Sequence, residues 1–200
     1  MSNKELPVFL TKEEQDKILA IPNSNYPTGE RNRSIIKLML DTGLKSQELV
    51  NLKWHDIDFI VNAIIVREDK KRKIPINQET IYFLKGWQKT QIEELRSREV
   101  DKDIEYVFTT LKGNKISTSY LRQMIYRVKD KTDIKKSISP STLRHTFAVN
   151  LYKKTKDIEK VQKQLGYDNI SNAAIYVEIV NNLENDKVSD EALWVFKNLH

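Results

Sequence analysis

The side chains best suited to binding a charged ligand in this sequence are basic, and they gather in two segments. One segment is the run Lys70–Lys73, and the other contains Arg122, Arg127, Lys129, Lys131, Lys135 and Lys136. Clustered cations can neutralise the phosphates of nucleic acid, but a charged run can also be a solvated face. The clusters alone leave both interpretations open.

Metal and thiol chemistry have few candidate ligands. The chain has no cysteine, and its three histidines are His55, His145 and His200. A disulfide and a thiolate metal site are therefore excluded, and a zinc site would need mostly carboxylate ligands. We expect no metal.

The composition is that of one globular domain. The 200 residues are 39% apolar, and 34 basic against 28 acidic side chains leave a net charge of +6. This apolar content is enough for a single buried core. No apolar run reaches the length of a membrane span, and Met1–Lys12 lacks the apolar core of a signal peptide. We therefore expect a cytoplasmic protein.

The residue patterns predict an α+β fold that is mainly helical. Apolar residues at helical spacing and capping residues predict helices over residues 11–19, 31–41, 45–52, 79–96, 120–131, 139–151 and 157–166, one from Ser171 and a last one from Ser189. Runs rich in β-branched residues predict a small antiparallel sheet of three strands, at residues 57–61, 63–67 and 73–76. Pro75 cannot donate to a neighbouring strand, so its strand should lie at the edge.

Four segments resemble, in order and separation, the catalytic domain of the tyrosine recombinases, the phage-integrase family. The first box matches Asp41–Leu49 with Leu52–Asp58, and the β-hairpin that follows it matches Arg72–Ile76. The second box matches Pro140–Ala148, and the third matches Leu165–Tyr176. Leu6–Thr11 also resembles the junction that precedes this domain, so the resemblance covers nearly the whole chain.

The resemblance implies DNA strand transfer through a 3′-phosphotyrosine, without metal, cofactor or ATP. Tyr176 stands in the position of the nucleophile, Arg144 in that of the second arginine, and His145 in that of the histidine after it. Because a phenol is a weak nucleophile and an alkoxide a poor leaving group, such a site needs phosphate clamps and a proton donor. The alternatives are that Tyr176 is a half-buried helix tyrosine and that Arg144 is a structural ion-pair partner, but the register of the boxes favours the functional interpretation of both.

Several positions depart from the family pattern. Lys45 replaces the first arginine, and a lysine keeps the charge but loses the planar fork that grips phosphate. Ser141 replaces the second-box histidine, and Tyr167 replaces the third-box histidine or tryptophan, although a tyrosine can still donate one hydrogen bond. Arg67 occupies the position of the hairpin lysine, and an arginine cannot serve as the general acid; Lys70 or Lys71 could take that role if the turn is shifted. Together these departures predict impaired catalysis.

Double-stranded DNA is the partner that the resemblance implies. The expected phosphate contacts are the basic residues of the hairpin and of the helix near residue 125: Arg67, Lys70, Lys71, Arg72, Lys73, Arg122 and Arg127. The family also suggests a role for the tail helix, residues 189–200, which could dock on a neighbouring protomer and form a homo-oligomer on DNA. Packing of this tail on its own protomer is the simpler alternative.

The predicted organisation is one catalytic domain over residues 1–200, with residues 1–10 as the junction segment. Family members usually carry an N-terminal helical domain that closes around the DNA, and we expect it to be absent here. Three functions then remain open. The chain could be a working recombinase or integrase of a phage or mobile element, a DNA-binding regulator or accessory factor whose catalysis has decayed, or an interaction module that keeps only the fold.

Overall fold

A computed structural model describes residues 6–67, 71–100 and 103–198, and the side chains among them as far as residue 185. These residues form two compact units, one over Pro7–Phe147 and one that contains Leu6 and the residues from Ala148 onward. Most residues are helical, and the strands form one small sheet, as the sequence predicts. None of the helices in the described part of the chain combines the length and the apolar character needed to cross a membrane.

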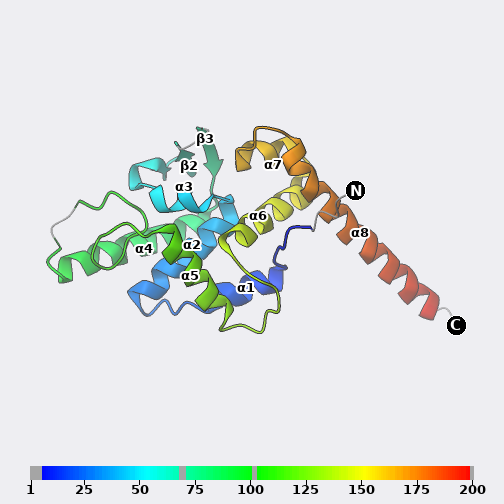
Figure 1. The fold of residues 1–200 in the computed structure, drawn as a ribbon, viewed down its shortest axis with the longest axis horizontal. Coiled ribbons are helices and arrows are strands. Elements are labelled where there is room, and N and C mark those ends of the chain that lie inside the picture. Colours follow the sequence, from blue (N-terminus) through cyan, green and yellow to red (C-terminus); the bar gives the residue numbers. More distant parts are fainter. Residues whose placement is uncertain (1–5, 68–70, 101–102, 199–200) are drawn as a thin grey trace. The chain divides into compact units, whose positions relative to one another are not determined.

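The described part of the first unit contains five complete α-helices and the beginning of a sixth (Figure 1). They are α1 (Lys12–Ala20), α2 (Pro27–Thr42), α3 (Ser46–Asn51), α4 (Gln78–Ser97), α5 (Thr118–Lys129) and α6 (Pro140–Thr155), the last of which contributes its residues up to Phe147. The predicted capping box is present at α1, where Thr11 Oγ1 accepts the amide of Glu14 and the Glu14 carboxylate accepts the amide of Thr11. The two hydrogen bonds of this capping box satisfy backbone amides that the start of a helix would otherwise leave unpaired.

Helix α2 forms the centre of the core of this unit and packs along α4. Its side chains Ile35, Leu38 and Met39 are fully buried. On α4, Trp87 is also fully buried, and its indole N–H donates to the carbonyl oxygen of Val107 over 2.6 Å. Because this donor is satisfied, the large indole ring can lie inside the core without an unpaired polar group.

The sheet is antiparallel in the order β1 (Ile57–Asp58), β2 (Ala63–Val66) and β3 (Arg72–Pro75). Pro75 therefore lies in an edge strand, as predicted. The first strand is shorter than the predicted 57–61 range, and the prediction is wrong beyond Asp58. The Asp58 carboxylate accepts the amides of Ile60 and Val61, and this local turn replaces further pairing with β2.

The second unit contains the rest of α6, then α7 (Ile158–Leu165) and α8 (Ser171–Asn198). Asp157 caps α7 by accepting the amide of Lys160, and Gly166 ends it with a left-handed φ of 68°, both as predicted. The predicted separate helix from Ser189 is wrong, because α8 runs without a break from Ser171 to Asn198. No glycine or proline interrupts this stretch, so a serine alone does not end the helix.

Candidate active site

The first candidate residue, Lys45, is placed by the turn between α2 and α3. Gly43 ends α2 with a φ of 63°, a left-handed conformation that glycine adopts without steric cost. The chain then turns so that Lys45 becomes the N-cap of α3. The amide of Lys45 donates to Glu48 Oε2 over 2.7 Å, which fixes the backbone from which the ammonium group projects.

Glu48 also ties α3 to the edge of the sheet. Its carboxylate accepts two hydrogen bonds from Arg72 of β3, Nη1 to Oε1 at 2.7 Å and Nη2 to Oε2 at 2.8 Å. The side chains of Glu48 and Arg72 are only 2% and 9% exposed, so this is a buried, bidentate ion pair. The prediction that Arg72 contacts phosphate does not fit this placement, because a buried carboxylate needs a cation and Arg72 supplies it.

The second-box residues lie on the first two turns of α6. Ser139 Oγ and Thr142 Oγ1 each accept the other residue's amide and thereby fix the start of this helix. Ser141, Arg144 and His145 stand three and four residues apart, a spacing that puts them on one face of a helix. Arg144 is buried, and its Nη1 donates to the carbonyl oxygen of Gly43, so the turn before Lys45 also holds the guanidinium.

His145 is the titratable group of this helix face. Burial and then the nearby positive charge of Arg144 both lower the pKa of the His145 imidazole from 6.5. Both effects disfavour the imidazolium. The ring is therefore neutral at neutral pH and can both accept and donate a proton.

These residues share one hollow in the first unit. It has a volume of about 230 Å³ and is lined by Leu44, Lys45, Ser46, Pro140, Ser141, Arg144 and His145. Four of the predicted catalytic residues, Lys45, Ser141, Arg144 and His145, are thus brought together from two segments far apart in the sequence. An ammonium, a guanidinium, a neutral imidazole and a hydroxyl around one small hollow suit a phosphate group.

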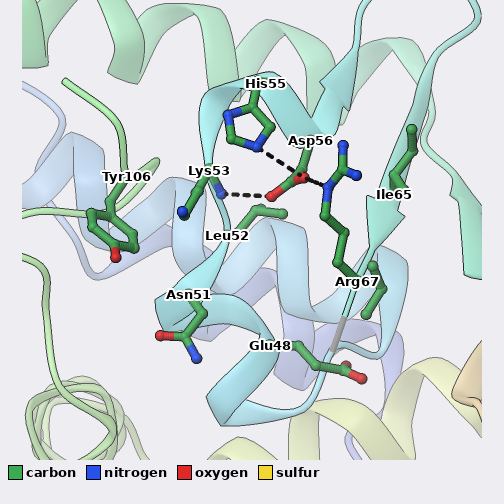
Figure 2. Close-up of a pocket in the computed structure, with 10 residues that line it drawn as sticks. Glu48, Asn51, Leu52, Lys53, His55, Asp56, Ile65, Arg67 and Tyr106 are labelled. Carbon is green, nitrogen blue, oxygen red and sulfur yellow. Dashed lines mark hydrogen bonds and ion pairs between the residues drawn. The ribbon is translucent and has the colours of Figure 1, made fainter. Parts of the chain in front are cut away.

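Arg67 is placed in a different hollow, shown in Figure 2, of about 330 Å³. Its Nε donates to Asp56 Oδ1 over 2.6 Å, and the Asp56 carboxylate, which is buried, also accepts the amide of Lys53. His55 lies close to the same Asp56 oxygen, with its Nε2 at 3.6 Å. Asp56, which the sequence reasoning missed, is thus the anchor of Arg67. Arg67 does not line the hollow around Lys45.

The remaining residues that we predicted to contact DNA lie on β3, before it and on α5, and all those that the structure describes are exposed. Lys71 and Lys73 are exposed, and Lys70 lies outside the described residues. On α5, Arg122 and Arg127 are exposed, opposite the buried face of that helix, as predicted. These four predicted contacts, Lys71, Lys73, Arg122 and Arg127, are therefore available to an anionic surface.

The third-box residues lie in the second unit. After Gly166, the amide of Tyr167 donates to the carbonyl oxygen of Gln162, and the Gln162 side chain donates back to the carbonyl oxygen of Tyr167 over 3.2 Å. Tyr176 lies on the second turn of α8 and is only 1% exposed. The phenol oxygens of Tyr167 and Tyr176 are 3.0 Å apart and share a hydrogen bond. The structure thus brings the predicted nucleophile and the third-box tyrosine together.

Comparison with known proteins places these features in a family context. The model of the phage integrase family matches residues 8–182. The chain is 28% identical over 183 residues to tyrosine recombinase XerC of Oceanobacillus iheyensis, covering 89% of this chain and 59% of the relative. It is 31% identical over 180 residues to tyrosine recombinase XerD of Staphylococcus aureus, covering 88% and 60%. The chain therefore spans about three-fifths of the length of these relatives.

Solved structures give the same result for the fold. The crystal structure of XerA recombinase matches with a TM-score of 0.76 and 28% identity, over 88% of this chain and 60% of that chain. A post-cleavage complex of the XerH site-specific recombinase with a palindromic difH substrate matches with a TM-score of 0.75 and 26% identity, over 92% and 53%. Integrase structures at lower identity, from transposon Tn1549 and from lambda, share the fold.

Proposed function

Because this chain belongs to the phage integrase family, the tyrosine recombinases, we propose that it acts in site-specific DNA recombination, with Tyr176 as the nucleophile. The observation that supports this most is the hollow in which Lys45, Ser141, Arg144 and His145 meet. Residues from the first and second boxes line it, and their charges suit one phosphodiester. The DNA-bound XerH relative supports duplex DNA as the partner.

In the proposed reaction the Tyr176 oxygen bonds to phosphorus and the bond from phosphorus to the 5′ oxygen breaks. Tyr176 gives up its proton to a base, and the departing 5′ oxygen gains one, so charge and protons balance. Lys45 and Arg144 neutralise the non-bridging oxygens, and the Gly43 carbonyl orients the Arg144 fork. The neutral His145 is able to take or return a proton. Attack by the 5′ hydroxyl on the phosphotyrosine reverses these steps and rejoins the strand.

The exposed cations Lys71, Lys73, Arg122 and Arg127 are the proposed phosphate contacts outside the hollow. Their contribution is independent of sequence, so it sets affinity rather than target choice. We also propose that the protein acts in the cytoplasm, and that residues 189–200 support homo-oligomers on DNA.

The test is covalent capture of DNA. The chain is incubated with a pool of nicked duplexes. Cleavage next to the nick releases a short fragment, so the cleaved strand cannot be rejoined. The sequence on either side of the nick is randomised so that the pool includes the unknown target. We expect a slowly formed adduct on a denaturing gel, absent from Tyr176→Phe, and sequencing of the captured strands then gives the target. Failure to form an adduct in both the unchanged chain and Lys45→Arg would contradict the proposed function.

A further inference from the structure

The phenol of Tyr167, at the third-box position, contacts the phenol of Tyr176. The two oxygens are 3.0 Å apart. Each phenol can donate one hydrogen bond and also accept one, so either can be the donor while both are neutral. Tyr176 is almost fully buried, whereas Tyr167 is half-buried.

The backbone around Tyr167 is fixed from several directions. Gly166 adopts the left-handed conformation that ends α7, and Gln162 bonds both the amide and the carbonyl group of Tyr167. Asn169 Oδ1 accepts the amide of Ser171 at the start of α8, the helix that carries Tyr176 on its second turn. The turn between α7 and α8 therefore sets the separation of the two hydroxyl groups.

Ionisation of the nucleophile gives this hydrogen bond one direction. When Tyr176 loses its proton, it can only accept, so within the pair Tyr167 must donate. A hydrogen bond to a charged oxygen is stronger than one between neutral groups, and it favours the charged form. The Tyr167 hydroxyl thus supports the state of Tyr176 that attacks phosphorus.

We propose that Tyr167 is a positioning residue, which holds the Tyr176 hydroxyl in place and donates a hydrogen bond to it as it ionises. The inference rests on the proposed function for its effect on cleavage. The hydrogen bond itself does not depend on that function, and the two can be tested separately.

The test compares Tyr167→Phe, which removes only the hydroxyl, with Tyr152→Phe, the same change at another half-buried tyrosine of the second unit. Adduct formation with the nicked pool is measured under single-turnover conditions, and DNA affinity is measured alongside. We expect Tyr167→Phe to slow adduct formation roughly 10- to 100-fold with little change in affinity, since a hydrogen bond to a charged group is lost. Tyr152→Phe should leave the rate unchanged.

A second readout needs no cleavage. In chains with carbon-13 at the tyrosine ζ carbons, in a mixture of H2O and D2O, a hydroxyl proton that exchanges slowly gives two ζ signals. We expect two signals for Tyr176, assigned by their loss in Tyr176→Phe, and a change in their separation or their merging into one signal in Tyr167→Phe. An unchanged Tyr176 signal in Tyr167→Phe, or an unchanged cleavage rate, would overturn the inference. Two signals without any adduct would instead support the hydrogen bond and count against the proposed function.

Discussion

At the residue scale, Lys45 is the departure from the family pattern that bears most directly on the proposed catalysis. Its backbone is fixed by Glu48, and its side chain lines the hollow with Arg144, so the charge is where a phosphate clamp needs it. A lysine offers a point charge in place of a planar fork. We expect Lys45→Arg to raise the single-turnover cleavage rate about tenfold or more, with DNA affinity changed far less. A rate that falls or stays the same would mean that the hollow is already adapted to lysine.

His145 makes stability depend on pH in a direction that the structure fixes. Burial and Arg144 lower its pKa from 6.5 in the folded chain, so below that pH the unfolded chain binds the additional proton. The stability linked to this group is therefore fully present above pH 6.5 and is lost as the pH falls below it. Urea unfolding at pH 7.5 and pH 5.5 should show a larger loss of stability in the unchanged chain than in His145→Gln. Equal losses in both would show that His145 titrates normally.

At the scale of elements, the sequence predicts local features better than long-range ones. The cap at Thr11, the helix ends at Gly43 and Gly166, and the edge position of Pro75 are encoded by residues within a few positions. The pairing of Glu48 with Arg72 and of Asp56 with Arg67 joins residues 24 and 11 positions apart. Such pairs depend on how α3 meets the sheet, and a pattern of charges alone cannot distinguish them from surface cations.

The ion pair of Glu48 and Arg72 should be the main link between α3 and β3. Because the Glu48 carboxylate is buried and the Arg72 side chain is only 9% exposed, Arg72→Ala leaves a buried carboxylate without its cation and should lower the free energy of unfolding by about 3–5 kcal/mol. Lys12→Ala is the control, since Lys12 pairs with Asp16 on an exposed helix surface and should cost less than about 1 kcal/mol. Urea denaturation measures both changes. Equal and small effects would show that the pair does not hold the two elements together.

At the scale of the whole molecule, the four family segments predicted the fold class correctly, because their order and spacing extend over nearly the whole chain. The net charge of +6 was weaker evidence, because it does not identify which cations can contact DNA. The same basic segments contain both exposed cations, such as Lys71 and Arg122, and Arg72, whose side chain is only 9% exposed and pairs with Glu48. Burial, which composition does not report, decides which of them can meet DNA.

The exposed arginines of α5 give the last prediction, which concerns DNA affinity. If Arg122 and Arg127 each contact a phosphate, each releases about one counterion on binding. The double variant Arg122→Gln/Arg127→Gln should therefore bind duplex DNA more weakly, and the slope of log affinity against log salt concentration should become shallower by roughly 2. The matched control is Lys12→Gln/Lys89→Gln, which also removes two positive charges, but from exposed positions on α1 and α4. Anisotropy over a salt series measures both. The same change of slope in both variants would mean that net charge, rather than contact at α5, determines binding.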